Sequence, residues 1–164
     1  MFRIEADNLY GASVGGTGKR SVLEMWIEIL LFILLAICAV FDALKKEIPL
    51  AVVWLGIVAA IVLRIRGDIG GGTWIEVLLS MLPGAAFWIL SLLTGEKVGY
   101  GDGWMLLMTG LFTGLGRCFL ILLVGLMLDS AIMLVLLALR KISTDKAVPF
   151  APFLMLGMGA VVWL

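Results

Sequence analysis

Long apolar runs constrain the fold of this chain more than any other feature of its sequence. Residues 29–41 contain no polar side chain except the thiol of Cys38, and similar runs recur along the whole chain. Of its 164 residues, 63% are hydrophobic, whereas globular domains are nearer half apolar. Runs of this kind are typical of helices that cross a lipid bilayer. The sequence therefore predicts an all-α, polytopic membrane protein.

The loops divide the chain into six predicted transmembrane helices. These cover residues 26–42, 50–63, 74–93, 104–113, 119–139 and 147–164. Pro49 suits the first turn of the second helix, and Pro83 is expected to kink the third. The apolar stretch 103–139 is too long for one span, so we place a break between the fourth and fifth helices. Three residues offer that break: Gly114, Gly116 and Arg117.

The polar, glycine-bearing residues 1–24 are expected to form a flexible N-terminal tail. They lack the layout of a signal peptide, and Met25 is itself a plausible first residue. The six helices form one membrane domain over residues 26–164, because a chain of this length leaves no room for a sizeable soluble domain. The sequence leaves the oligomeric state open.

Composition narrows the chemistry that this chain can perform. Its formal net charge is zero, which gives no reason to expect a nucleic-acid partner. It has no histidine, which removes Ser-His and Cys-His nucleophile pairs and HExxH zinc sites. Cys38 and Cys118 fit neither a disulfide framework nor a zinc pair and are expected to be packing residues. We expect no cofactor and no metal ion, so carboxylates remain as the natural acid and base.

Asp42 stands at the end of the first predicted helix. A carboxylate there faces the negative pole of the helix dipole, at a cost of up to about 1 kcal/mol. A purely structural interpretation is that Lys45 and Lys46, one turn further on, compensate its charge.

Asp102 ends the segment Gly99-Tyr100-Gly101-Asp102, and alone it could be the N-cap of the fourth helix. Counting spans changes this interpretation, because the second helix crosses away from Asp42 and the third returns before Asp102. Both acids are therefore predicted at one membrane face. Paired carboxylates share a proton, so one can serve as base while the other serves as acid. Glycines admit a close-lying backbone, which makes Gly99 and Gly101 candidate substrate-binding residues.

Basic residues predict the orientation of this face. Its loops carry six lysines and arginines against three in the opposite loops, which places the two acids at the cytoplasmic side. The three basic residues of the tail, counted on the opposite side, would make the totals equal.

Asp129 lies in the middle of the fifth predicted helix, with no lysine or arginine at its depth. A neutral acid that bonds to Ser130 or Thr109 would be tolerated in a bundle, yet an acid within the membrane is also a functional candidate. A small ion- or proton-coupled transporter with Asp42, Asp102 and Asp129 as its relay is therefore an alternative function.

Three motifs together resemble those of the type IV prepilin peptidase family, aspartic membrane proteases of the GxGD kind. The resemblance covers residues 26–164. The motifs are Asp42 with Lys45-Lys46 and Ile48-Pro49, then Gly99-Tyr100-Gly101-Asp102, then Val148-Pro149-Phe150-Ala151-Pro152-Phe153-Leu154.

The resemblance implies that Asp42 and Asp102 are a catalytic pair, without telling which is acid and which is base. It implies a prokaryotic inner-membrane endopeptidase that removes the basic leader of prepilins or pseudopilins at the cytoplasmic face, next to a glycine. It also implies that Pro149 and Phe150 help to shape the substrate site.

The chain departs from the family pattern at three places. Leu50 stands where the family usually has asparagine, and Trp104 stands where it usually has lysine. The loop over residues 43–48 is too short for the cysteine-bearing insert that is linked to N-methylation in larger members, so we expect peptidase activity without a recognisable methyltransferase domain, and the sequence leaves open whether N-methylation also occurs. Trp104 also keeps open a further alternative, a relative that binds pilins without cleaving them.

Overall fold

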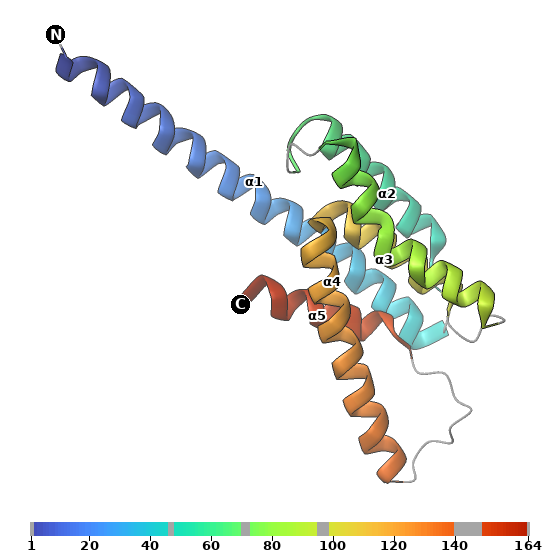
Figure 1. Cartoon of the computed structure of the whole chain (residues 1–164). Helices are drawn as coiled ribbons and strands as arrows, with labels where there is room; N and C mark the ends of the chain where they lie inside the picture. The colour runs from blue at the N-terminus through green and yellow to red at the C-terminus, as the bar shows by residue number, and fades with distance from the viewer. Residues whose placement is uncertain (1, 46–47, 70–72, 95–98, 140–148, 164) are drawn as a thin grey trace.

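The computed structural model describes residues 2–45, 48–69, 73–94, 99–139 and 149–163 (Figure 1). These residues form five helices: α1 (Phe2–Lys45), α2 (Leu50–Ile65), α3 (Trp74–Leu93), α4 (Tyr100–Ala138) and α5 (Ala151–Trp163). The all-α prediction is confirmed for this part of the chain. The helix α1 begins at Phe2, so the backbone of the expected tail is helical there. The flexible tail over residues 1–24 and the separate domain over residues 26–164 stay predictions.

The structure does not show the six helices that the sequence predicted. The single helix α4 covers the stretches assigned to the fourth and fifth spans, and it is interrupted at Gly114, whose φ of 81° and ψ of 170° are not helical. Glycine alone adopts this conformation readily, so one residue can redirect the chain without a loop. After Gly114 the helix returns toward its first part, since the Cys118 thiol donates to the Leu106 carbonyl at 3.7 Å.

Three helical segments are long and apolar enough to cross a membrane: Val22–Lys45, Trp74–Leu93 and Tyr100–Ala138. The helices α2 and α5 are apolar but shorter. Large apolar side chains such as Leu55 and Leu134 are exposed on the protein surface, as expected where helices face lipid. The chain is accordingly a multi-pass membrane protein.

The first part of α4 packs tightly against α3 because small residues let the two backbones approach. A β-carbon at Gly84 would lie 2.5 Å from the Leu107 nitrogen, and one at Gly110 would collide with the Ser80 carbonyl. Around this pair the core contains fully buried side chains from several helices, among them Leu31, Leu35, Met105, Met108 and Leu154. Close contact with α3 holds the first part of α4 in place.

Contacts between distant residues define two ends of the bundle. At one end, which we call the aspartate end, the Ala151 amide of α5 bonds to Asp42 of α1, and Ile48 lies against Gly101 of α4. At the other end, which we call the arginine end, Arg117 beyond the Gly114 kink pairs with Glu28 of α1. The helices connect these two ends, and charged side chains gather at both.

Candidate active site

Asp42 lies in the last turn of α1 and is only 7% exposed. Its Oδ2 accepts a hydrogen bond of 3.0 Å from the backbone N–H of Ala151, the first residue of α5. This N–H has no partner within its own helix, and the positive end of the α5 dipole offsets the unfavourable position of Asp42 at the end of α1. The lysine compensation that we considered is not seen, because the Lys45 ammonium lies over the Phe41 ring, 5.6 Å from its centroid. Lys46 lies outside the described residues.

Asp102 is the third residue of α4, and the N-cap is Gly99. The N-cap interpretation of Asp102 is therefore wrong, because α4 begins at Tyr100 and not at the predicted Trp104. The Asp102 N–H donates to the Gly99 carbonyl at 3.0 Å, and its carboxylate folds back over Gly99. A β-carbon at position 99 would lie only 2.7 Å from Asp102 Oδ2. Gly99 thus leaves room for this carboxylate.

Gly101 leaves room for a different neighbour. A β-carbon there would lie 2.7 Å from Cδ1 and 2.9 Å from Cβ of Ile48, which precedes α2. The segment after Asp42 is thereby held against the segment that contains Asp102. Each of the two glycines has a packing neighbour within the chain, and their contact with a substrate stays a prediction.

Asp102 has two acidic neighbours within electrostatic range. They are Asp42 of α1 and Asp129 farther along α4, whose negative charges act on it. Among the described residues, no lysine or arginine forms an ion pair with any of the three. Asp129 is half-buried in the second part of α4, which the Gly114 kink redirects toward Asp102. Thr109, one of the two partners considered for Asp129, donates its hydroxyl proton to the Met105 carbonyl at 2.8 Å.

Phe150 directly precedes α5, and the expected part of Pro149 and Phe150 in a substrate site stays a prediction. The Phe150 carbonyl accepts from the amides of Phe153 at 3.0 Å and Leu154 at 3.1 Å, so Phe150 closes the first turn of the helix. Its buried ring stacks on Phe87 of α3, with 6.0 Å between centroids. These contacts fix the position from which the next amide reaches Asp42. Sequence reasoning missed this partner, since no pattern indicates which helix N-terminus meets which acid.

With this geometry established, comparison with known proteins decides the family. The sequence model of the Type IV leader peptidase family matches residues 29–137, which is more than half of the chain and includes all three aspartates. The chain belongs to the type IV leader peptidase family. No match was found among curated proteins or among solved structures.

The departure from the family pattern at Trp104 lies away from the aspartates. Two residues along a helix turn a side chain by about 200°, so Trp104 projects from the face of α4 opposite Asp102. Its ring contacts Trp54 of α2 at 5.0 Å between centroids, Tyr100 at 6.3 Å and Trp88 of α3 at 6.4 Å. Trp104 is therefore a packing residue in this member of the leader peptidase family. Leu50, the other departure, is the exposed first residue of α2.

A metal-binding site needs several ligand atoms that converge on one point. Within the described residues, no group of three or more acidic, cysteine or histidine side chains is arranged so that it could hold a metal ion. The site contains one carboxylate from each of two helices. The Asp42 carboxylate is held by the Ala151 amide, and the Asp102 carboxylate lies beside Gly99.

Proposed function

We propose that this protein is an aspartic endopeptidase that removes the leader peptide from prepilins or pseudopilins, with Asp42 and Asp102 activating water. One observation carries the proposal. Two carboxylates from α1 and α4 lie within electrostatic reach of each other in a chain of the leader peptidase family. Without histidine, a carboxylate pair is the natural acid–base machinery for peptide hydrolysis.

In the proposed reaction, one carboxylate takes a proton from water while the water oxygen attacks the scissile carbonyl carbon. The other, protonated, donates its proton to the carbonyl oxygen. Collapse of the tetrahedral intermediate breaks the C–N bond, and the leaving amine takes a proton from the pair. Coupled acids titrate as a unit, so the two roles are not divided between Asp42 and Asp102.

The surroundings suit these steps. The Oδ2 of Asp42 is held by the Ala151 amide, which leaves Oδ1 for water. Gly99 is exposed and has no side chain, so an extended substrate backbone can approach Asp102 there. Three aspartates without a described cationic partner also create a negative potential, which favours a basic leader. We place this site at the cytoplasmic face of a prokaryotic inner membrane.

The test is cleavage of a prepilin in liposomes that contain the purified protein. Asp42→Asn and Asp102→Asn should each lower the cleavage rate at least about a hundredfold, because each removes an acid–base group. Arg66→Gln removes an exposed charge that belongs neither to the aspartate site nor to the lining of the cavity at the arginine end, and it is the control, expected to cleave like the wild type. If either aspartate variant has normal helix content and cleaves at the wild-type rate, the proposed mechanism is wrong.

The two alternatives make different predictions in the same liposomes. A transporter needs acids distributed through the bilayer, whereas Asp129 interacts with Asp102 at the aspartate end. Solute uptake that depends on Asp129 but not on Asp42 would support the transporter. A non-cleaving relative would bind prepilin without product, and its best argument, Trp104, faces away from Asp102.

A further inference from the structure

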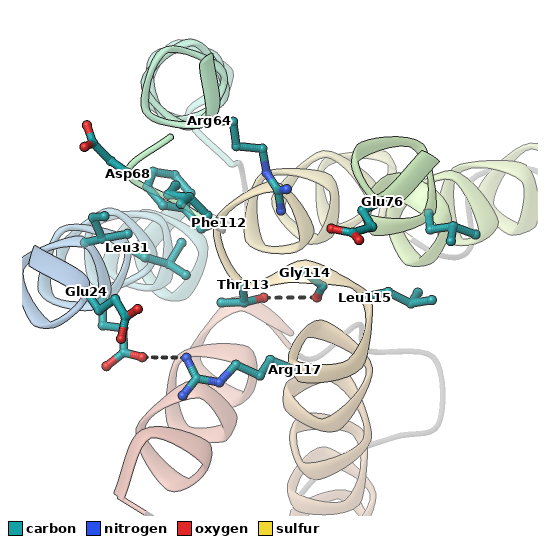
Figure 2. A pocket seen from close by; sticks show the side chains of 14 residues that line it. Glu24, Leu31, Arg64, Asp68, Glu76, Phe112, Thr113, Gly114, Leu115 and Arg117 are labelled. Carbon is teal, nitrogen blue, oxygen red and sulfur yellow. Dashed lines mark hydrogen bonds and ion pairs between the residues drawn. The ribbon is translucent and has the colours of Figure 1, made fainter. Parts of the chain in front are cut away.

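The arginine end of the bundle contains a cavity of about 320 Å³ that the peptidase chemistry does not use (Figure 2). Side chains of α1, α2, α3, α4 and the segment after α2 line it. Its charged lining residues are Glu24, Glu28, Arg64, Asp68, Glu76 and Arg117. Four negative charges and two positive ones therefore face one hollow, with apolar side chains such as Leu31 and Phe112 at its base.

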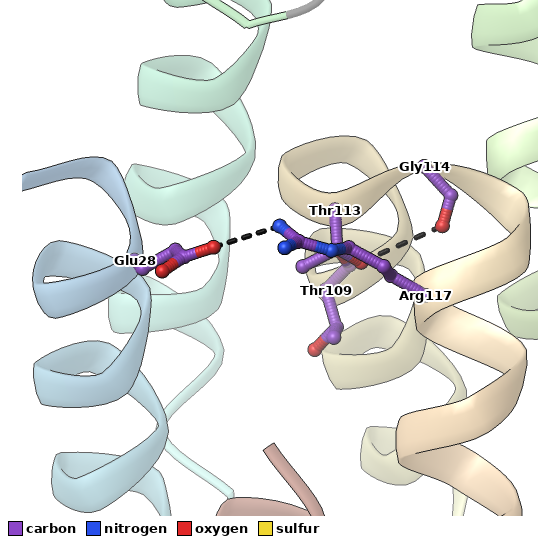
Figure 3. A network of polar contacts seen from close by, with 5 residues as sticks. All are labelled: Glu28, Thr109, Thr113, Gly114 and Arg117. Carbon is purple, nitrogen blue, oxygen red and sulfur yellow. Dashed lines mark hydrogen bonds and ion pairs between the residues drawn. The ribbon is translucent and has the colours of Figure 1, made fainter. Parts of the chain in front are cut away.

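The two arginines keep donors free for a ligand. Arg117 Nη1 donates to Glu28 Oε1 at 2.7 Å (Figure 3), and Arg64 Nε donates to the Leu111 carbonyl at 2.7 Å. A guanidinium has five N–H donors, and each of these has only one such bond with the described residues. In Figure 2 Thr113 lies between the two arginines, and the Arg117 side chain extends toward the carboxylate of α1 with which it pairs. This geometry suits an anionic group with several acceptor oxygens, such as a phosphate.

An apolar groove adjoins the cavity. It has a volume of about 320 Å³ and runs between α1 and α5, and the two hollows share Glu28. The other lining residues are Met25, Ile29, Phe32, Met158, Gly159 and Val162. A β-carbon at Gly159 would meet only the Phe32 ring, at 3.7 Å, so the groove is open at this point.

We propose that the cavity and the groove together bind one phospholipid whose head group carries a primary amine. Arg64 and Arg117 would hold its phosphate, the surplus carboxylates would accept hydrogen bonds from its ammonium, and one acyl chain would lie in the groove. The lining charges select the head group. A net-anionic head group would meet four carboxylates, and a quaternary ammonium has no N–H to donate to them.

Such a lipid would tie α1 to α4 and α5, since its head group touches Glu28 and Arg117 and its chain touches α5. The protein lies in a bilayer, so this ligand is available to it continuously. Binding to the folded state alone would stabilise the fold by mass action.

The test uses the full chain, delipidated in detergent, with phosphatidylethanolamine, phosphatidylcholine and phosphatidylglycerol of identical acyl chains. Native mass spectrometry should detect one bound phosphatidylethanolamine, with an affinity about tenfold above the other two, and the same lipid should raise the unfolding temperature most. Soluble phosphoethanolamine at the same concentration should not displace it. Displacement by that compound would overturn the lipid assignment in favour of a free small zwitterion.

Two variants locate the site independently. Arg117→Gln should weaken phosphatidylethanolamine binding about tenfold by removing charge-assisted phosphate contacts. Gly159→Leu should weaken it by filling the groove, with no effect on the charges. Arg66→Gln is the matched control, because Arg66 is exposed near Asp68 but does not line the cavity. Equal binding of all three lipids, or wild-type binding by both Arg117→Gln and Gly159→Leu, would overturn the proposal.

Discussion

The two ends of the bundle both gather carboxylates, but they balance the negative charge in different ways. At the arginine end, Glu28 pairs with Arg117 at 2.7 Å, and Asp68 lies 3.5 Å from Arg66. At the aspartate end, no described lysine or arginine pairs with Asp42, Asp102 or Asp129. There the acids rely on a backbone amide and on helix N-termini. The Glu28–Arg117 pair joins α1 to α4 at one end, whereas the acids at the other end have no described cationic partner.

The two ends also differ in the reason why each needs a glycine. At Gly99, the Asp102 carboxylate occupies the space that a side chain would need. Gly114 has nothing within 4 Å of a β-carbon, and its requirement for glycine comes from its positive φ alone. The first glycine therefore leaves room for the Asp102 carboxylate, and the second lets the chain change direction. Substitutions can separate these two roles.

The largest effect is expected for Gly99→Ala. The new β-carbon would lie 2.7 Å from Asp102 Oδ2 and displace the carboxylate, which should lower kcat for prepilin cleavage about a hundredfold. The free energy of unfolding should change by less than about 1 kcal/mol, because the position is an exposed N-cap. Parallel kinetics and urea unfolding check both. A variant with wild-type kcat would show that the position of Asp102 does not matter.

Gly114→Ala should instead act on stability. A φ of 81° with a ψ of 170° is essentially reserved for glycine, so alanine should lower the free energy of unfolding by about 1–3 kcal/mol. Cleavage per folded molecule should stay near wild type. Gly116→Ala is the matched control, since its β-carbon also meets nothing within 4 Å but its φ is not positive. If the two variants have equal free energies of unfolding, the positive φ of Gly114 does not explain the loss of stability.

Counting the first three helices was enough to predict that Asp42 and Asp102 lie at one membrane face, and their catalytic pairing stays a prediction. Asp129 was named as a candidate, but its approach to Asp102 depends on the direction that α4 takes after Gly114, which the sequence does not indicate. The sequence did predict a break at Gly114, but as a loop between two helices. A kink made by one non-helical residue has no sequence pattern that distinguishes it from a short loop. The bond from Ala151 to Asp42 depends on tertiary packing alone.

Trp104 shows how a helix boundary changes a functional interpretation. The sequence predicted a helix that begins at Trp104, a position where the family usually has lysine. The observed helix begins at Tyr100, so Asp102 and Trp104 are both helical and point to opposite faces. The concern that tryptophan in place of lysine disables the site therefore loses its geometric basis.

The smallest effect is expected for Trp104→Phe. Phenylalanine keeps an aromatic ring against Trp54 and Trp88, so kcat should stay within about twofold of wild type. The lost contact area should cost about 1 kcal/mol of stability, which thermal unfolding can measure. A tenfold or larger fall in kcat at unchanged KM would place Trp104 in the catalytic machinery and blur the contrast between the two faces of α4.

The central claim is that Asp42 and Asp102 act as one unit, and a double-mutant cycle on prepilin cleavage tests it most directly. Asp42→Glu and Asp102→Glu keep both carboxyl groups but displace them by one methylene, so each should retain measurable activity. The activation free energies of the single and double variants should fail to add by about 1 kcal/mol or more, because each acid acts through the other. Additivity within about 0.5 kcal/mol would contradict the account, since it would mean that the two acids work independently.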